Sequence, residues 1–382
     1  MHHPEELRPA PERSDPAAPI AFVDRAPRAG PNAPQRPRAP AHTPRLRAPV
    51  FCGLGGASAG ARSAGLDVAL GVDSHAQRLG VFKLNFPEAE SVCGQLAVPN
   101  SVFTEAMLRA KLPKGEFHVH FSPPCQELSV ARGAKNADAA RSAQAMIKWC
   151  VDFAMNCGAL SWSLEEVNSA EVYEALESMQ RLNDHGHLNF LIRDVDSQNL
   201  GVPQTRRRYI AGSPWLLRHL AEQERNPTFL SVAAAFAATT RKDAGGNPLQ
   251  VRGTHLRGHN PSQTAVGYKR ADRGLRSVHD AAFTLTCHLS SYWATKSYRN
   301  ADGEFTGAYQ GTPSTFKLTP FSHEDALVVQ CFPDDFKIGP SRVVARDGIG
   351  NAVPPPVMQR MLSFYGLEER AVEEPATKRR CA

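Results

Sequence analysis

Segments of two kinds alternate along the first half of this chain, and they differ in the spacing of their apolar residues. Phe117, Val119 and Phe121 occupy every second position, as in a buried strand. From Ala139 to Cys157 the apolar positions instead recur on one face of a helix. The same reasoning predicts further strands near 51–52, 68–72, 160–168, 188–195 and 208–212, and helices near 57–66, 75–86, 102–111, 169–182, 323–332 and 357–362. Strands that alternate with helices indicate a doubly wound α/β domain.

Residues 213 to about 316 lack this alternation. Glycine, arginine, histidine and polar residues dominate there, and long helical patterns are sparse. Basic side chains concentrate in this part of the chain: Arg241, Lys242, Arg252, His255, Arg257, His259, Lys269, Arg270, Arg273 and Arg276. We therefore expect a smaller domain of loops and short strands, with a charge suited to reading DNA.

The N-terminal segment, residues 1–48, is rich in proline and arginine and poor in large apolar residues. Such a segment cannot bury enough surface to offset its ordering entropy, so we predict a disordered tail. It is either an extension without a function or a salt-sensitive tether to nucleic acid. The predicted division of the chain is 1–48 tail, 49–212 catalytic and cofactor-binding domain, 213–345 target recognition domain, 346–366 C-terminal motif that packs back on the catalytic domain, and 367–382 flexible basic tail.

Composition narrows the class of protein further. The 382 residues are 42% hydrophobic and 21% charged, as in a globular protein. No apolar run approaches the roughly 18 residues of a membrane span, and the first residues lack the apolar core of a signal peptide, so we expect an intracellular protein without a membrane partner. The eight cysteines include no Cys-x-x-Cys pair, which argues against a thiolate zinc site, and we expect no metal. The net charge of +6 permits a polyanionic partner.

A glycine-rich turn follows the first predicted strand. Phe51 leads into Gly53, Gly55 and Gly56, where the absence of side chains lets the backbone approach a ligand. The second strand ends at Asp73, about 20 residues further on, where nucleotide-type cofactors have their ribose hydroxyls held. This arrangement predicts an adenosine-bearing ligand.

Cys125 is placed directly after the strand 117–121 and two prolines, Pro123 and Pro124. Proline stiffens the backbone, and a thiol held at the tip of a strand is suited to act as a nucleophile. A lone cysteine is more often a small buried hydrophobic residue. This segment alone leaves both interpretations open.

Two further segments place charge at strand ends. Glu165 and Glu166 end the strand 160–168, where the ordinary interpretation is a solvated turn. Arg206 and Arg208 lead into the strand 208–212, and alternation places both on the same face. They form either a basic surface turn or a pair of rigid donors aimed at one ligand.

The ordered set of motifs resembles the DNA (cytosine-5)-methyltransferase family. The motifs lie in the family's order between 50 and about 365: Phe51-x-Gly53-x-Gly55-Gly56, Pro123-Pro124-Cys125-Gln126-x-x-Ser129, Glu165-Glu166-Val167, Gln204-x-Arg206-x-Arg208, Glu324 with Gln330-x-Phe332-Pro333-Asp334, and Gly350-Asn351-Ala352-Val353-Pro354. The variable basic segment lies between the fourth and fifth blocks, as in the family. Together the blocks are far more specific than any one of them.

The resemblance implies roles for residues of this chain. Cys125 would be the nucleophile, Glu165 would hold the base, and Arg206 and Arg208 would bind the O2 side of the ring and the neighbouring backbone. Residues implied to contact the substrate are Gln126, Ser129, Arg132 and Gln204. The cofactor would be S-adenosylmethionine, held by Phe51, Gly53, Gly55, Gly56, Asp73, Gln95, Pro123, Asn351 and Val353. We expect double-stranded DNA as the partner and a monomeric enzyme.

Two positions depart from the family pattern. Glu166 stands where the family has Asn, so it could raise the pKa of Glu165 or face away from it. Gly94-Gln95 stands where the family has Gly-Asp, which leaves an acceptor without a charge.

Three functions remain open from the sequence. The leading hypothesis is a DNA (cytosine-5)-methyltransferase, with or without a restriction partner. The second is the same chemistry on a tRNA cytosine, as in one branch of the family. The third is a catalytically inactive homologue that binds DNA as a regulatory subunit.

Overall fold

The computed structural model describes residues 45–96, 104–112, 116–124, 128, 137–182, 190–252, 254–257, 275–286, 291–296 and 316–373. The chain divides into two compact units, 1–38 and 39–382, and every described residue belongs to the second unit. The predicted tail up to residue 44 therefore lies outside the described residues.

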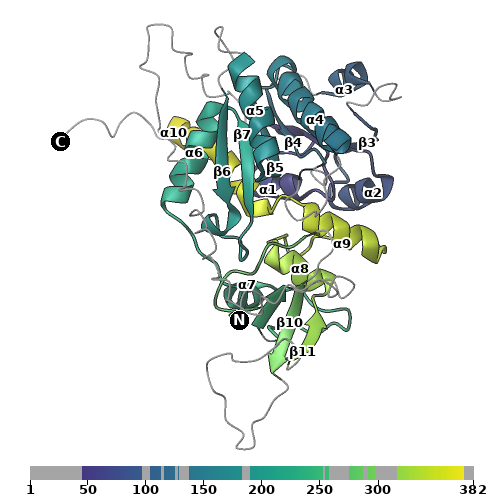
Figure 1. Cartoon of the computed structure of the whole chain (residues 1–382), viewed down its shortest axis with the longest axis vertical. Coiled ribbons are helices and arrows are strands. Elements are labelled where there is room, and N and C mark those ends of the chain that lie inside the picture. Colours follow the sequence, from purple (N-terminus) through teal and green to yellow (C-terminus); the bar gives the residue numbers. More distant parts are fainter. Residues whose placement is uncertain are drawn as a thin grey trace, which may run out of the picture. The chain divides into compact units, whose positions relative to one another are not determined.

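A seven-stranded sheet forms the centre of the first part of this unit (Figure 1). Its strands are β1 (Arg45–Val50), β2 (Leu70–Asp73), β3 (Glu90–Cys93), β4 (Phe117–Phe121), β5 (Ser161–Val167), β6 (Leu191–Asp196) and β7 (Arg207–Gly212). The strand order is β3-β2-β1-β4-β5-β7-β6. The first five strands pair in parallel, whereas β7 runs antiparallel to both β5 and β6. This confirms the predicted doubly wound α/β sheet.

Helices cover both faces of the sheet. Buried side chains of α1 (Gly56–Ser63), α2 (Ala76–Asn85), α6 (Pro214–Arg225) and α10 (Pro355–Glu373) belong to one hydrophobic cluster. Those of α3 (Glu105–Lys111), α4 (Ala137–Asn156) and α5 (Ala170–Leu182) belong to another. Every residue of β4 and β5 is buried, because each strand is covered on both sides.

The predicted helical stripe of α4 packs on β4. Cys150 and Phe153 are almost completely buried, and the ring of Phe153 meets the ring of Phe121 with centroids 6.0 Å apart. The strand and helix periods therefore place their apolar positions against one another, as the sequence predicted.

The second part of the unit holds a four-stranded sheet of order β11-β10-β8-β9, in which every pair is antiparallel. Its strands are β8 (Thr254–Arg257), β9 (Leu275–Arg276), β10 (Ser291–Lys296) and β11 (Phe316–Pro320), with helices α7 (Val232–Ala238) and α8 (His323–Val329) beside them (Figure 1). Helix α9 (Arg342–Asn351) packs on α8. Trp293 is fully buried against Phe236 and Phe321, and its Nε1–H donates to Asp325 at 3.0 Å. These residues share a cluster with the α1 and α10 side of the large sheet.

Three boundaries differ from the sequence prediction. Strand β1 begins at Arg45, because the backbone there pairs with β4 although its residues resemble the proline- and arginine-rich tail. Helix α10 continues to Glu373, into the predicted C-terminal tail.

Helix α6 is the third difference. It lies in the segment 213–345 but packs on β6, β7 and α10 through Leu216, Leu217 and Leu220, so we propose that the recognition domain begins after α6, near residue 226. Its apolar pattern and its N-terminal Pro214 were visible in the sequence. No helix in the described parts of the chain combines the length and the apolar composition that a membrane crossing requires.

Candidate active site at the carboxyl edge of the sheet

The strands β1 and β4 lie side by side at the centre of the large sheet, yet the chain leaves them in opposite directions. After β1 it turns toward β2, and after β4 it continues toward β5. Such a reversal opens a crevice at the carboxyl ends of the two strands, where ligands of doubly wound folds bind. The glycine-rich turn follows β1, and Ser122-Pro123-Pro124 follow β4. Both predicted motifs therefore lie at this crevice.

The glycine-rich turn is fixed by Asp73. Phe51 and Gly53 have positive φ angles of +59° and +54°, which a tight turn requires. The Gly53 N–H donates to Asp73 Oδ2 at 2.9 Å, and the His75 N–H donates to Asp73 Oδ1 at 2.8 Å. The carboxylate thus joins the turn to the start of α2, and its remaining lone pairs can still accept hydroxyl groups.

The glycines of this turn differ in the space around them. A Cβ added at Gly53 would meet no atom within 4 Å, whereas one at Gly55 would lie 2.5 Å from the Phe86 ring. A Cβ at Gly56 would lie 2.3 Å from the carbonyl oxygen of Val353. Gly53 therefore faces open space that a ligand can fill, while Gly55 and Gly56 permit close packing.

The C-terminal motif packs directly on this turn. Val353 is buried, and Asn351 is the last residue of α9. A Cβ at Gly60 would lie 2.2 Å from the carbonyl oxygen of Pro355, because α1 and α10 are in close contact. The remaining predicted cofactor residues are Gln95, which is exposed just after β3, and Pro123, which is buried just after β4.

Glu165 and Arg208 form an ion pair at the same edge. Their strands β5 and β7 are antiparallel neighbours, so the start of β7 lies beside the end of β5. Arg208 Nε lies 3.1 Å from Glu165 Oε1, and the two side chains are 18% and 8% exposed. The contact is a close ion pair rather than an aligned hydrogen bond, since Oε1 has no hydrogen-bond partner among the described residues.

Glu166 lies on the opposite face of β5. Successive strand residues alternate between faces, and Glu166 is 1% exposed on the side of α4, near Cys150. Its Oε2 accepts the Val167 N–H at 2.7 Å. Burial raises the pKa of the Glu166 carboxyl well above its usual value, and the charge of Glu165 raises it further. The structure therefore favours the second sequence alternative, in which Glu166 faces away.

Arg206 and Gln204 form internal contacts. Arg206 is 1% exposed, and its guanidinium donates to the carbonyls of Leu285 and Gly350 at 3.0 and 3.1 Å. Gln204 is fully buried and donates to the side-chain oxygen of Gln330 at 2.9 Å. We propose that both residues hold the recognition segment and the C-terminal motif against β7, instead of contacting the substrate as the sequence predicted.

Four predicted site residues lie outside the described residues: Cys125, Gln126, Ser129 and Arg132. Their flanking positions are described. Pro123 is buried, Pro124 is exposed, and Leu128 is fully buried. Because β4 and β5 are parallel neighbours with Phe121 opposite Leu164, Ser122, Pro123 and Pro124 leave the sheet at the edge where Glu165 lies.

The sequence reasoning missed a set of polar residues beneath this edge. His118 and His120 of β4 and Ser161 and Ser163 of β5 are all buried, and the two imidazoles contact the two serines through hydrogen bonds. The signal was present, because polar residues occupy every second position of both strands. Only the apolar half of that alternation entered the prediction.

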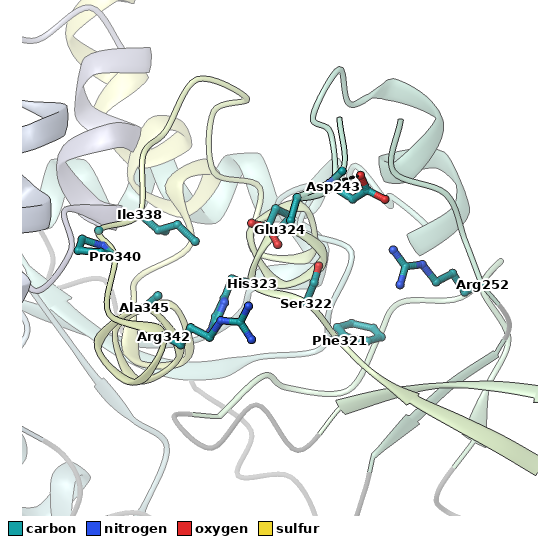
Figure 2. A pocket seen from close by; sticks show the side chains of 13 residues that line it. Asp243, Arg252, Phe321, Ser322, His323, Glu324, Ile338, Pro340, Arg342 and Ala345 are labelled. Atoms are coloured by element: carbon teal, nitrogen blue, oxygen red, sulfur yellow. Dashed lines mark hydrogen bonds between the residues drawn. The ribbon is translucent and has the colours of Figure 1, made fainter. Parts of the chain in front are cut away.

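A separate cavity of about 520 Å³ lies between the 243–252 turn and the N-terminal ends of α8 and α9. Arg342, His323, Glu324 and Arg252 lie around it, so its charges have mixed sign (Figure 2). None of the predicted catalytic or cofactor residues lines it. In the described part of the chain, no group of three or more His, Cys, Asp or Glu side chains could hold a metal ion.

Comparison with known protein families gives a match over most of the chain. The model of a family described as C-5 cytosine-specific DNA methylase matches residues 48–213 and 233–364. No curated protein matches the sequence significantly.

Solved structures resemble the chain in fold. A putative DNA modification methyltransferase encoded within an E. coli prophage is 17% identical, with a TM-score of 0.51, and the match covers 86% of this chain and 100% of that chain. The S. pombe Dnmt2 methyltransferase is 14% identical, with a TM-score of 0.57 and coverage of 84% and 98%. The Entamoeba histolytica methyltransferase EhMeth is 12% identical, with a TM-score of 0.52 and coverage of 85% and 98%. At these identities the likeness concerns the fold alone.

Proposed function

Because this chain belongs to the C-5 cytosine-specific DNA methylase family, we propose that it transfers a methyl group from S-adenosylmethionine to carbon 5 of a cytosine in double-stranded DNA. The observation that carries the proposal is the ion pair of Glu165 and Arg208. It lies at the edge of the sheet where Ser122, Pro123 and Pro124 follow β4. A carboxyl group and a guanidinium are two of the groups that this chemistry requires, and Cys125, the next residue after Pro124 in the sequence, would supply the third.

The reaction begins with the activation of the ring. Carbon 5 of cytosine is too weak a nucleophile to attack a methyl sulfonium. Addition of the Cys125 thiolate to carbon 6 would give carbon 5 enamine character, so that carbon 5 would take the methyl group as the bond from that methyl group to the sulfonium sulfur breaks and the donor leaves as a neutral thioether. A base then removes the carbon 5 proton, the bond between carbon 6 and the sulfur breaks, and Cys125 leaves as the thiolate.

Glu165 and Arg208 stabilise the ring during these steps. Glu165 holds the N3 and N4 edge of the base, and a proton shared with N3 offsets the charge that develops on the ring. Arg208 binds the O2 side. Their ion pair keeps both side chains oriented before the substrate arrives, which lowers the reorganisation needed in the transition state.

The cofactor residues fit an adenosine-bearing ligand. Gly53 leaves open space in a turn of positive φ, and Asp73 retains lone pairs for ribose hydroxyls. Phe51, Gln95, Pro123, Asn351 and Val353 would complete the site. S-adenosylmethionine would supply an activated methyl group there, while the residues of the chain hold it against carbon 5.

The target carbon is covered in a duplex, so the cytosine must leave the base stack at a cost of a few kcal/mol. The basic segment after α6 would bind the DNA backbone and read the bases beside the target.

The proposal is tested by tritiated methyl transfer to duplex DNA and to tRNA. We expect transfer to DNA and none to tRNA. Transfer to tRNA alone would replace DNA by RNA as the substrate, and transfer to neither would leave the inactive DNA-binding homologue. Cys125→Ser should abolish transfer while DNA binding is retained.

A covalent trap identifies the nucleophile. DNA that contains 5-fluorocytosine should form a stable adduct with the wild type. Fluorine replaces the carbon 5 proton in this base, and the enzyme is released only when that proton is removed. The matched control is Cys93→Ser, since Cys93 is an exposed cysteine of β3. An adduct with Cys125→Ser would assign the nucleophile to another residue.

A further inference from the structure

A row of polar side chains runs along one face of the β4–β5 pair and ends at the candidate active site. His118 pairs with Ser161 and His120 pairs with Ser163 in the sheet register. These positions alternate with the apolar residues that face α4, so they share the face toward α10. Glu165 is the next residue of β5 on this face.

The half of the row near the active site is continuous. Ser122 Oγ lies 2.9 Å from His120 Nε2, and His120 Nδ1 lies 2.8 Å from Ser163 Oγ. Ser163 Oγ also lies 3.0 Å from His118 Nε2. Each heavy-atom separation is that of a hydrogen bond.

The other half reaches the last helix. His118 Nδ1 lies 2.7 Å from Ser161 Oγ, and Ser161 Oγ is hydrogen-bonded to the phenolic hydroxyl of Tyr365. Tyr365 belongs to α10 and is 3% exposed. One unbroken chain of hydrogen bonds therefore runs from α10, through both strands, to the residue that precedes Pro123. We call it the His–Ser chain.

Both imidazoles of the His–Ser chain are neutral. Burial lowers the pKa of His120 to about 3, and burial together with the neighbouring His120 lowers the pKa of His118 well below its usual value. A neutral imidazole has one N–H donor and one acceptor nitrogen, and a hydroxyl has a single proton.

This restriction leaves two consistent orders of protons. In one order every group donates toward Tyr365, and both histidines carry the proton on Nδ1. In the other every group donates toward Ser122, and both carry it on Nε2. A mixed order would set two lone pairs against each other, or would make one serine accept from both of its neighbours and leave its own proton without an acceptor among the groups of the chain, which is costly in a buried site.

The phenol at the far end selects between the two orders. A phenol, with a pKa of about 10, is far more acidic than the aliphatic hydroxyl of Ser161, so it is the better donor of the two. Tyr365 then donates to Ser161, Ser161 donates to His118, and the direction continues along the chain. The last bond is donated by His120 Nε2–H to Ser122 Oγ, which leaves the Ser122 proton free to be donated onward.

We propose that Tyr365 sets this direction, so that the Ser122 hydroxyl donates a hydrogen bond to an acceptor atom of the bound nucleotide or methyl donor at the carboxyl edge. Ser122 follows Phe121, which pairs with Leu164, so its position corresponds in register to that of Glu165. Ser122 is a positioning residue for methyl transfer, and Tyr365 acts on it through the chain. The role in methyl transfer rests on the proposed function, whereas the direction of the chain does not.

The direction is tested without any activity measurement. Imidazole ¹⁵N chemical shifts in NMR distinguish the two neutral tautomers. We expect His118 and His120 of the wild type both to carry the proton on Nε2. In Tyr365→Phe, which removes only the terminal hydroxyl, we expect a mixture of both tautomers. Protons on Nδ1 in the wild type, or unchanged tautomers in Tyr365→Phe, would overturn the proposal even if the protein is an active methyltransferase.

The role of Ser122 is tested by a double-mutant cycle on methyl transfer. Loss of one hydrogen bond lowers kcat/KM about 5-fold, so we expect about this effect for Ser122→Ala and a smaller one for Tyr365→Phe. The double variant should match Ser122→Ala, since Tyr365 acts only through Ser122. Additive losses, or full activity of Ser122→Ala, would overturn the role. A rise in KM for S-adenosylmethionine or for DNA identifies which substrate carries the acceptor.

The matched control is Tyr173→Phe. Tyr173 lies in α5, where its ring meets the ring of Tyr209, and it has no part in the His–Ser chain. It should leave both tautomers and kcat/KM unchanged. Thermal unfolding of each variant separates a loss of folded protein from a loss of rate per folded molecule.

Discussion

The two faces of the β4–β5 pair come from the same two segments and have opposite chemistry. One face meets α4 and α5 with apolar side chains only, apart from Glu166 at its end. These side chains are Phe117, Val119, Phe121, Trp162 and Leu164. The other face carries polar side chains, of which Ser161 meets Tyr365 of α10: His118, His120, Ser161, Ser163 and Glu165.

The difference separates stability from chemistry. Apolar burial is non-directional and tolerates small shifts, so it can hold the strands without specifying any donor or acceptor. Buried polar groups are stable only when each finds its partner, so they specify orientation as well as proximity. The candidate catalytic carboxyl group, Glu165, continues the polar face, where orientation is controlled.

The largest effect on the free energy of unfolding is expected from a substitution that removes packing on the apolar face. Phe121→Ala removes a fully buried ring that contacts Phe153, and such a substitution costs about 4 kcal/mol of unfolding free energy. Chemical denaturation measures this cost. Phe229→Ala is the control, since Phe229 is 62% exposed, and its cost should stay within about 0.5 kcal/mol. Equal costs for both variants would contradict the proposed role of this face.

A substitution on the polar face should lower the rate of methyl transfer more than it lowers the free energy of unfolding. Glu165→Gln removes the charge that pairs with Arg208, and we expect kcat for methyl transfer to fall about 100-fold. The unfolding free energy should change by less than about 1 kcal/mol, because the amide retains the shape of the side chain. Glu174→Gln, at an exposed position of α5, should leave kcat unchanged. A large loss of stability in Glu165→Gln with normal kcat would reverse the comparison.

A fall in pH should reduce the contribution of the polar face to the free energy of unfolding. The pKa of His120 is lowered from 6.5 to about 3 by burial, and that of His118 is lowered as well. Their contribution to stability is therefore complete above pH 6.5 and decreases as the pH falls toward 3. Each histidine costs about 1.4 kcal/mol per pH unit in this range. Urea unfolding between pH 7 and pH 5 measures the slope.

The control for the acid slope is an exposed histidine. His279→Gln should leave the slope unchanged, because the His279 side chain is exposed and forms no part of the buried polar face. An unfolding free energy that stays constant from pH 6.5 downward would show that the two buried imidazoles do not resist protonation.

The smallest effect is expected at Glu166, the one charged residue at the end of the apolar face. Burial raises its pKa, so its contribution to stability is present below pH 4.5 and is lost as the pH rises through the pKa of the folded state. Glu166→Gln cannot ionise, so it should gain about 1.4 kcal/mol over the wild type with each pH unit between 4.5 and the pKa of the folded state, and nothing further above that pKa. Unfolding of both proteins at a mildly acidic and a mildly alkaline pH measures the difference. A constant difference would mean that Glu166 does not titrate.

The local patterns of the sequence determined most of the elements. The alternation of 117–121 and the helical stripe of 139–157 predicted β4 and α4 because each pattern depends only on residues close together in the chain. The order of the motifs identified the family, and the family match confirmed it. The motif positions also predicted that Glu165 and Arg208 act together, and the structure places them in contact.

Tertiary structure alone decided what each polar residue meets. Arg206 and Arg208 were expected on one ligand, yet Arg206 donates to carbonyls of Leu285 and Gly350. The His–Ser chain closes only because α10 returns to the sheet and brings Tyr365 onto Ser161. Local periodicity gives the face on which a side chain lies, but it contains no information on which distant segment will cover that face. That choice depends on how the whole chain packs, and for this protein it determines the hydrogen bonds beneath the candidate active site.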